Sequence, residues 1–310
     1  MKNITVGVIG TGSMGTHHVR LFASMPGVRL IGVSDADPSA LEKSAKAHRV
    51  PGFADFRDLL ALKPDAVSIA VPTSLHEKTA LAAIRAGCHV LLEKPIAGSS
   101  SSARRIIRAA AQKKVKLMIG HTERFNPAVA EVKKALRGEK IISFDITRVG
   151  PLPPRIKDVG IIIDLAIHDI DLLRHLTGAE IDKVVSLHRS VSGPHEDTAM
   201  ILLRLTGGVM AHITVNWLTP FKARLLQVAT LGKFIRADLL NRTVSVYSRT
   251  PQTEDGGLIK EMPVGNGEPL KAELAAFAGC VRTGSPVPVS GEDGLRALLV
   301  AEKCLKKSLR

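Results

Sequence analysis

Apolar runs and helical patterns alternate along residues 1–120. Short runs rich in β-branched residues, such as Ile4–Ile9, predict buried strands, and between them apolar residues recur at helical spacing. This alternation is typical of a doubly wound parallel sheet of the α/β class. The predicted strands are Ile4–Ile9, Val28–Ser34, Pro51–Ala54, Ala66–Val71, Val90–Leu92 and Lys116–Ile119, and the predicted helices are Ser13–Ser24, Ser39–His48, Leu75–Ala86 and Ser100–Gln112.

The pattern changes from His121 onward. A helix and a strand are followed by a proline-rich connection, a further helix and a series of short strands separated by turns. We expect a first domain at 1–120 and an α+β domain with a mostly antiparallel sheet at 121–310, whose final helix (294–308) packs back on the first domain. The predicted elements are helices at Pro127–Leu136, Lys271–Arg282 and Gly294–Ser308, and strands at Ile141–Arg148, Lys183–Ser190, Thr198–Leu205, Val209–Trp217, Leu225–Leu231, Phe234–Asp238 and Thr243–Tyr247.

Composition narrows the class of protein. With 310 residues, 45% of them hydrophobic, the chain can bury the cores of two domains. No apolar run approaches the ~18 residues of a membrane span, and the N-terminus leads straight into a strand without a signal peptide. Cys88, Cys280 and Cys304 are scattered and form no CxxC pair, which argues against disulfides and metal ligation. We therefore expect a cytoplasmic protein with no membrane contact and no metal.

The net charge of +14 raises the question of a nucleic-acid partner. Aromatic residues make up only 3% of the chain, so few side chains are available to stack on bases, and the basic residues are spread out. We expect no nucleic acid. The excess positive charge suits an anionic small molecule such as a nucleotide sugar.

A glycine-rich segment directly follows the first predicted strand. Gly10 permits a tight turn, Gly12 lets the backbone approach a pyrophosphate, and Gly15 lets the next helix sit close to the strand. The helix N-terminus offers N–H groups to the phosphates, and Asp35, at the end of the second strand, suits a ribose hydroxyl. This predicts a Rossmann domain that binds NAD through Gly10, Thr11, Gly12, Ser13, Met14, Gly15 and Asp35.

Two further strand ends carry polar residues. Ligands of such sheets bind beyond the carboxyl ends of the strands, so both ends should meet the glycine loop at one edge. We expect the cofactor to contact Pro72, Thr73, His76, Glu93 and Lys94.

The predicted helix around Ile167 has an unusual polar stripe. Asp164, His168, Asp171 and His175 fall at positions i, i+4, i+7 and i+11 of an otherwise apolar helix. Acids and imidazoles on one face suit a cleft where protons move, although a solvated helix face has a similar pattern.

These motifs resemble the glucose-fructose oxidoreductase, inositol dehydrogenase and MocA (Gfo/Idh/MocA) family over essentially the whole chain. The segments that show this resemblance are GTGSMG (10–15), AVPTSLH (70–76), EKP (93–95), DLAIHDID (164–171) and SGEDGLRALLVAE (290–302). The resemblance implies a Rossmann domain, an α+β domain with an open sheet that often mediates oligomers, and NAD(P)-dependent chemistry at a sugar or polyol carbon. It places His76 on the nicotinamide side. Ala166 departs from the pattern, since many members have glycine there.

Lys94, Asp164 and His168 match the catalytic lysine, aspartate and histidine of that family. Lys94 can donate to a substrate hydroxyl and stabilise the developing alkoxide, although most lysines are simply exposed. His168 suits a general base because imidazole titrates near neutrality, and Asp164, one helical turn earlier, can hold the ring. The same aspartate also suits the N-terminus of a helix.

A narrower resemblance, to dehydrogenases that oxidise C3 of a UDP-N-acetylhexosamine, is carried by GHTERFNPAV (120–129), by 148–171 and by NWLTPFKAR (216–224). Arg148, Arg155 and Lys157 are candidates for a diphosphate site, but a solvated basic loop explains them equally well. Trp217 suits the core better than a sugar platform. The predicted substrate contacts are Arg124, Asn126, Arg148, Arg155, Lys157 and Trp217, and we expect a homo-oligomer, either a dimer or a tetramer.

Two alternatives stay open. The substrate can instead be a free polyol or monosaccharide such as inositol, and the basic loop is then ordinary surface. In a different class, the chain can be a dinucleotide-binding sensor without chemistry, although the presence of Lys94, Asp164 and His168 argues against it.

Overall fold

The computed structural model describes residues 3–152, 158–248 and 258–306. The chain divides into two compact units. The first comprises Met1–His121 and Leu270–Arg296, and the second comprises Thr122–Pro269 and Ala297–Arg310. Residues 270–296, which the sequence pattern left with the second domain, therefore belong to the first unit.

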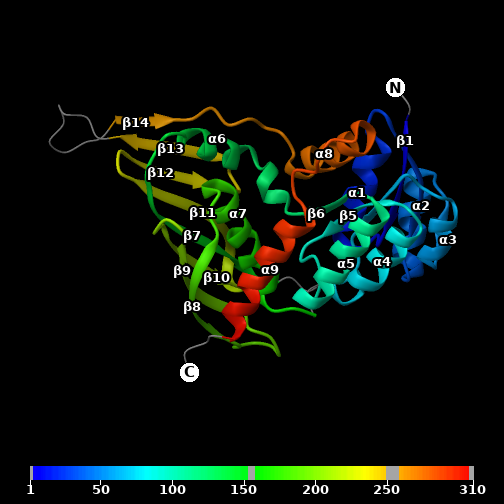
Figure 1. Cartoon of the computed structure of the whole chain (residues 1–310), viewed down its shortest axis with the longest axis horizontal. Helices are drawn as coiled ribbons and strands as arrows, with labels where there is room; N and C mark the ends of the chain where they lie inside the picture. The colour runs from blue at the N-terminus through cyan, green and yellow to red at the C-terminus, as the bar shows by residue number, and fades with distance from the viewer. Residues whose placement is uncertain (1–2, 153–157, 249–257, 307–310) are drawn as a thin grey trace. The chain divides into compact units, whose positions relative to one another are not determined.

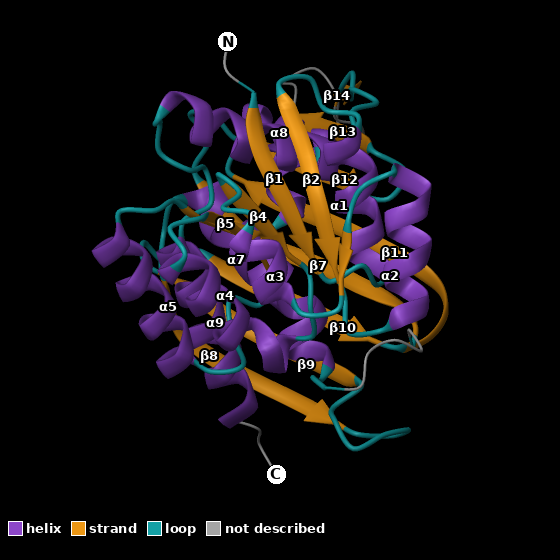
Figure 2. Cartoon of the chain, turned by 90° about the vertical axis from the view of Figure 1, so that its right-hand side faces the viewer, coloured by secondary structure: helices purple, strands orange, loops and turns teal. Residues whose placement is uncertain are grey.

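The first unit contains a six-stranded sheet in the order β3-β2-β1-β4-β5-β6, and all its strand pairs are parallel. Figure 2 shows β1 and β2 side by side, running the same way. The strands are short apolar runs, because helices cover both faces of such a sheet. Their bounds are β1 Ile4–Ile9, β2 Val28–Ser34, β3 Gly52–Phe53, β4 Ala66–Ile69, β5 His89–Glu93 and β6 Leu117–Gly120.

Helices connect these strands, as the sequence predicted. Gly87, with φ +83°, follows the predicted C-terminal end of one of them. One helix, α3 (Phe56–Ala61), was not predicted, because six residues are too few to show a helical period; Asp55 caps it by accepting from the backbone N–H of Arg57. The other bounds are α1 Ser13–Ala23, α2 Pro38–His48, α4 His76–Arg85, α5 Ser100–Lys113 and α8 Pro269–Thr283.

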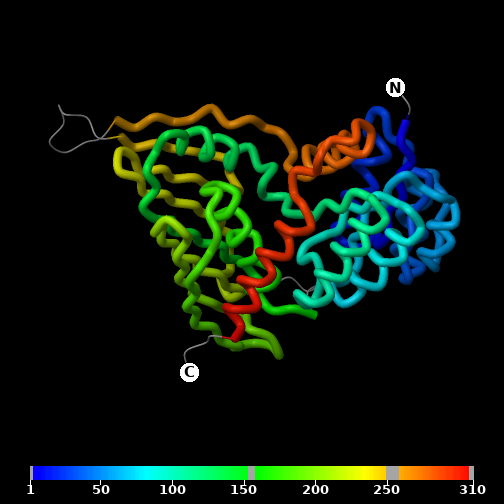
Figure 3. The backbone as a smooth tube through the Cα atoms, viewed as in Figure 1, coloured from blue at the N-terminus to red at the C-terminus, as the bar shows by residue number. Residues whose placement is uncertain are grey.

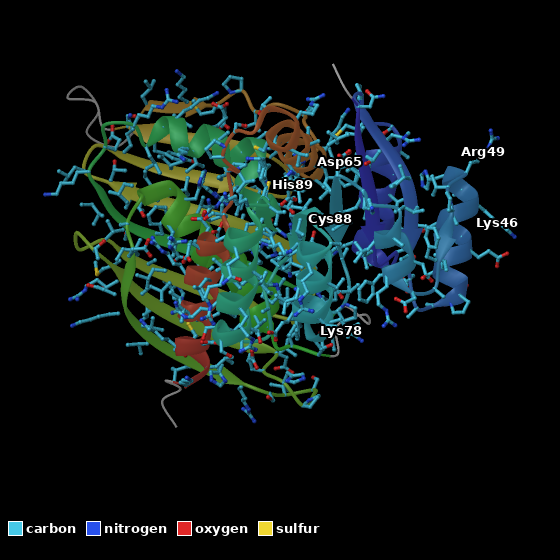
Figure 4. All side chains as sticks on the ribbon, turned by 45° about the vertical axis from the view of Figure 1, so that its right-hand side comes forward. Lys46, Arg49, Asp65, Lys78, Cys88 and His89 are labelled. Carbon is cyan, nitrogen blue, oxygen red and sulfur yellow. The ribbon has the colours of Figure 1, made fainter. Side chains whose placement is uncertain are left out.

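The two edges of the first sheet carry different residues. Figure 4 shows Asp65, Cys88 and His89 close together, where β4 and β5 begin, and Lys78 toward the opposite edge, beyond the end of β4. The glycine loop follows β1 at that carboxyl edge, where ligands of parallel sheets bind.

The second unit contains an eight-stranded sheet in the order β14-β13-β12-β11-β7-β10-β9-β8. Of its strand pairs only β7 and β10 are parallel, so the predicted mostly antiparallel sheet is confirmed. Strand β11 begins earlier than predicted, because its first half is largely exposed and shows no apolar alternation, and the exposed β14 likewise has no alternation to reveal it. The bounds are β7 Ile141–Pro151, β8 Ile181–Arg189, β9 Thr198–Leu205, β10 Met210–Asn216, β11 Leu218–Thr230, β12 Lys233–Asp238, β13 Thr243–Ser248 and β14 Leu258–Glu261.

Helices α6 (Pro127–Ala135) and α7 (Ile167–Thr177) lie over one face of this sheet (Figure 1). Along β9, Ile201 and Leu203 are buried, while Met200 and Leu202, which point the other way, are more than half exposed. The sheet is therefore open on one face, as expected.

The last described element is the helix α9 (Gly291–Lys306), red in Figure 3, whose first turns belong to the first unit and whose remainder belongs to the second. Within the described ranges, no helix is both long and apolar enough to cross a membrane, and no cluster of three or more His, Cys, Asp or Glu side chains is arranged to hold a metal.

Candidate active site

The glycine loop after β1 leaves open space beside the N-terminus of α1. Gly10 has φ +91°, and a Cβ there would lie 2.6 Å from the carbonyl oxygen of Ala70. A Cβ on Gly15 would lie 1.8 Å from the carbonyl oxygen of Gly10, so glycine is needed for the helix to sit this close. A Cβ on Gly12 would meet nothing within 4 Å. The first turn of α1, with Ser13 and Met14, begins next to this open position, and the unpaired N–H groups of such a turn suit a pyrophosphate.

Asp35 is held in place by backbone and side-chain donors. Its Oδ2 accepts from the backbone N–H (2.5 Å) and the hydroxyl (3.1 Å) of Thr11, and its Oδ1 accepts from the backbone N–H of Asp37 (2.9 Å). Oδ1 keeps a further acceptor site, which suits a ribose hydroxyl. Thr11 is buried, so in this structure it holds Asp35 instead of facing the open loop.

A cavity of about 600 Å³ lies between the glycine loop and the ends of β2 and β4. It brings Gly10, Gly12, Asp35 and Pro72 together at one place, as the sequence predicted for a parallel sheet. Arg57 and Lys78 also line the cavity, and neither was predicted to do so. Arg57 belongs to the unpredicted α3, and Lys78 lies on α4. The other lining residues are Ile9, Ser34, Ala36, Asp37, Ala54, Asp55, Phe56, Ala70, Val71, Leu75 and Thr79.

His76 ties together the ends of β4 and β5. Its ring is 1% exposed, with Nδ1 2.7 Å from the carbonyl oxygen of Pro95 and Nε2 3.0 Å from that of Val71. Thr73, just before it, is half-buried in a short 3-10 turn (Thr73–Leu75). The histidine thus positions the loop that carries Lys94.

The Glu93-Lys94-Pro95 segment ends β5, and its first two residues have different surroundings. Lys94 is half-buried, and its backbone N–H donates to Oε2 of Glu93 at 3.2 Å. Glu93 is only 7% exposed, and its Oε1 lies 3.1 Å from Nε2 of His18. The direct cofactor contact predicted for Glu93 is thus not what this geometry shows, because its carboxylate is held by the protein.

The polar-striped helix begins with a π-helical turn. Ile162–Ala166 is π-helical, and the α-helix α7 follows from Ile167. Such turns are rare and often occur at functional sites. They place Asp164, 5% exposed, within the π turn and the half-buried His168 at the start of α7. Both lie in the second unit, whereas Lys94 lies in the first.

Charged residues next to the stripe form a buried cluster of ion pairs. Arg148, 2% exposed, donates both Nε and Nη2 to Asp169 and donates Nη1 to Glu123 at 2.8 Å. Arg224 joins the same cluster at Glu123 (2.9 Å). Burial alone would lower the pKa of Arg148, but the charges of Asp169 and Glu123 outweigh it and the pKa is raised. Arg148 is therefore a buried structural cation, and the predicted diphosphate contact is corrected.

Two other predicted substrate contacts also serve the second unit itself. Arg124 donates Nε (2.7 Å) and Nη2 (2.6 Å) to Asp171, a stripe residue that is 1% exposed. Asn126, 4% exposed, caps α6 by accepting from the backbone N–H of Ala128, and it donates to the carbonyl oxygen of Leu239 (3.0 Å). Neither side chain is turned to solvent, because each fixes an element of the unit.

Trp217 follows β10 and is 6% exposed, as expected for a core residue. Its Nε1 is itself buried and has no hydrogen-bond partner among the described residues. Arg155 and Lys157 lie outside the described residues.

Comparison with known proteins agrees with this architecture. The family model "Oxidoreductase family, NAD-binding Rossmann fold" matches residues 4–121, and the Gfo/Idh/MocA C-terminal domain matches residues 141–234. The UDP-N-acetylglucosamine 3-dehydrogenase of Acidithiobacillus ferrooxidans is 32% identical, over 97% of this chain and 96% of that protein. Inositol 2-dehydrogenase 2 of Saccharopolyspora erythraea is 28% identical, over 97% of this chain and 92% of that protein.

Solved structures show the same fold. A crystal form of the Acidithiobacillus ferrooxidans enzyme superposes with a TM-score of 0.93 at 30% identity, covering 99% of this chain and 98% of that one. Levoglucosan dehydrogenase in complex with NADH and levoglucosan superposes with a TM-score of 0.90 at 22% identity, covering 99% and 97%.

Proposed function

Because this chain belongs to the Gfo/Idh/MocA family, as its motifs indicated, we propose that it oxidises C3 of a UDP-N-acetylhexosamine, such as UDP-N-acetylglucosamine, to the 3-keto sugar. It is an NAD(P)-dependent oxidoreductase acting on CH–OH groups. The full-length likeness to a UDP-N-acetylglucosamine 3-dehydrogenase is the observation that supports this substrate.

The residues at the carboxyl edge of the first sheet fit a nicotinamide dinucleotide. The open space at Gly12 suits the pyrophosphate, and the spare acceptor of Asp35 suits a ribose hydroxyl. When bound, the dinucleotide supplies the acceptor for the hydride that leaves the sugar carbon. Ser13 and Met14 offer backbone N–H groups there, and Pro72, Thr73 and His76 shape the loop beside it.

The proton chemistry is assigned to three side chains. His168 takes the proton of the sugar hydroxyl, and Asp164 orients and stabilises the imidazolium that forms. Lys94 donates a hydrogen bond to the same oxygen and stabilises its developing negative charge. His168→Ala and Lys94→Ala should each lower kcat by roughly 100-fold or more while NAD binding persists. Near-full activity of His168→Ala would move the base elsewhere.

The diphosphate site now depends on fewer cations. With Arg148 committed to Asp169, Arg155 and Lys157 are the proposed phosphate contacts, and Trp217 stays a proposed substrate contact. A charge-assisted phosphate contact contributes about 1.5–3 kcal/mol, so Arg155→Ala should raise KM about tenfold or more with little change in kcat. The exposed Arg204, paired with Asp182, supplies the control variant Arg204→Ala, whose KM should match the parent.

The deciding experiment compares NADH formation from UDP-N-acetylglucosamine, free N-acetylglucosamine and inositol, with UDP as competitor. We expect turnover of the nucleotide sugar alone and competitive inhibition by UDP. Equal or better turnover of the free sugars would refute the nucleotide sugar as the substrate. The assignment as a dehydrogenase of the Gfo/Idh/MocA family would remain.

Oxidation of a free polyol is the second candidate. Inositol dehydrogenases are among the relatives, and the burial of Arg148 removes one expected phosphate contact. In that case UDP would not inhibit, and Arg155→Ala would leave KM unchanged.

We assign NAD in preference to NADP. The carboxylate of Asp35 would repel a 2′-phosphate, and its hydrogen bonds to Thr11 and Asp37 hold it in position. Asp35→Ala should narrow the ratio of kcat/KM for the two cofactors. A wild-type preference for NADP would refute the assignment.

We further propose a homo-oligomer in the cytoplasm. The open face of the second sheet exposes Val185, Leu187, Met200, Leu202 and Met210, an apolar surface that suits a second copy of the chain. Light scattering should show a dimer or tetramer, and Leu202→Lys should weaken it. A monomer at micromolar concentration would contradict this assembly.

A further inference from the structure

A chain of buried polar side chains runs behind Lys94 through the first unit. Oε1 of Glu93, at the end of β5, lies 3.1 Å from Nε2 of His18 in α1, and Nδ1 of His18 lies 2.6 Å from Oγ of Ser68 in β4. Their exposures are 7%, 1% and 0%. A buried carboxylate costs free energy even when it is paired, and an apolar residue would serve packing as well. The proposed cofactor contact does not account for these three residues.

The carboxylate of Glu93 is held on several sides. Its Oε2 accepts the backbone N–H of Lys94 at 3.2 Å, and the carboxyl group packs closely against Gly120 of β6, where a Cβ would lie only 3.1 Å from it. Burial alone would raise the pKa of Glu93, but the hydrogen bond and charge of His18 and the charge of Lys94 outweigh it, and the pKa is lowered. Glu93 is therefore an anion next to Lys94.

The hydrogen bonds that join Glu93, His18 and Ser68 can be complete in either protonation state of His18. An ionised Glu93 can only accept, so Nε2 of His18 carries a hydrogen. In the neutral ring, Nδ1 then accepts from the hydroxyl of Ser68, and in the imidazolium it donates to the same oxygen. Ser68 adapts by rotating its hydroxyl, so the hydrogen bond that holds the carboxylate of Glu93 is kept in both states.

Resting on the proposed function, we propose that Glu93 is a positioning residue that fixes the Lys94 backbone and holds the Lys94 ammonium protonated during turnover. Lys94 is assigned as a cationic donor, yet the nicotinamide of NAD+ and the protonated His168 are positive, and like charges favour loss of its proton. The buried carboxylate next to Lys94 offsets this, and His18 and Ser68 keep it there.

Few other titratable groups surround Glu93. His18 faces it from α1, Lys94 adjoins it in its own segment, and β4 and β6 present the uncharged Ser68 and Gly120. The buried His121 follows β6, and His76 of α4 contacts the Pro95 carbonyl.

The first test is Glu93→Gln, which removes the charge and can keep every hydrogen bond. The amide oxygen accepts from Lys94, and the amide NH₂ donates to His18, whose other nitrogen then donates to Ser68. We expect the alkaline limb of kcat/KM against pH to move to lower pH by about one unit or more, with NAD affinity retained. Ser68→Ala keeps the carboxylate and should leave that limb in place, even if kcat falls. The proposal would be overturned if the alkaline limb of kcat/KM in Glu93→Gln lay at the same pH as in the wild type.

The second test needs neither substrate nor a folded Glu93→Gln. Because the pKa of Glu93 is lowered in the folded state, its contribution to stability is present above 4.5 and is lost as the pH falls through the folded pKa. Without the charge of Lys94 the folded pKa of Glu93 rises, so in Lys94→Met the acid loss of stability should begin at higher pH than in the wild type. Lys43→Met, an exposed lysine on α2 in the same unit, is the control.

The two tests separate the proposals. Identical acid profiles for Lys94→Met and wild type would refute the coupling of Glu93 to Lys94, whatever the substrate is. If no sugar yields NADH but the acid profile shifts, the proposed function fails and the pairing of Glu93 with Lys94 stands.

Discussion

Placing a methyl group on Gly12 tests the cofactor site with little effect on the fold. A Cβ there would meet no heavy atom within 4 Å, and φ is −68°, so alanine fits and the free energy of unfolding should change by less than about 1 kcal/mol. The methyl group instead enters the space assigned to the pyrophosphate. If it costs one charge-assisted hydrogen bond to phosphate, about 1.5–3 kcal/mol is lost, and Kd for NAD rises between about tenfold and 100-fold.

Thermal unfolding with and without NAD measures both effects. At a concentration of 100 times the wild-type Kd, NAD stabilises the parent by about 2.7 kcal/mol, or about 5–10 °C in Tm. A 100-fold weaker variant gains only about 0.4 kcal/mol, or about 1–2 °C. Gly279→Ala, in α8 of the same unit and also free of contacts within 4 Å, is the control; it should raise the apo Tm slightly and keep the full NAD shift.

Two outcomes would refute this reasoning. A full NAD shift in Gly12→Ala would mean that no phosphate approaches Gly12, and the loop would lose its assigned role. Severe loss of apo stability would mean that the space is not open. Gly15→Ala must behave differently, because its Cβ would lie 1.8 Å from the carbonyl oxygen of Gly10, and it should destabilise the apo protein as well.

Two further predictions concern buried groups. Arg148→Met should lower the free energy of unfolding by about 3–5 kcal/mol in urea titrations, because Asp169 loses its buried partner; a loss no larger than that of Arg204→Met, which breaks an exposed pair, would contradict the burial. Cys88 and Cys304 should resist alkylation at pH 8 until the protein unfolds, because burial raises their thiol pKa to about 11, with a contribution from Asp65 at Cys88, and to about 12; mass spectrometry of the labelled native protein would disprove this if either carried the label.

Local signals were sufficient for most elements of the fold. Strands β1 and β2 have the predicted bounds, because uninterrupted apolar runs are required wherever helices cover both faces of a sheet. The elements that were missed have no such signal: α3 is a single short segment, and β14 is an exposed strand that pairs with β13.

The sequence also predicted the role of each glycine in the loop after β1, because each role depends on the space around that glycine. Gly10 and Gly15 would clash with backbone atoms if they carried a Cβ, and Gly12 faces open space, as the spacing of the motif indicated. The position of Asp35 at the end of the second strand follows from the same local order.

Which charged residues are buried was decided only by the tertiary structure. In the sequence, Arg148 is as basic as Arg155, yet packing places Arg148 against Asp169 and Glu123 and removes it from solvent. The π-helical turn at Ile162–Ala166 likewise has no counterpart in the helical spacing that predicted the stripe.

The buried side chains next to Lys94 show why the sequence alone does not predict the environment of a buried polar group. His18, Ser68 and Glu93 lie on three elements, and the sequence alone indicated only Glu93. The periodicity of apolar residues predicts the local secondary structure and which face of an element is buried. The ionisation and hydrogen bonding of a buried group depend on the atoms that sheet order and register bring to it from elsewhere in the sequence, because in a low-dielectric interior those contacts replace water.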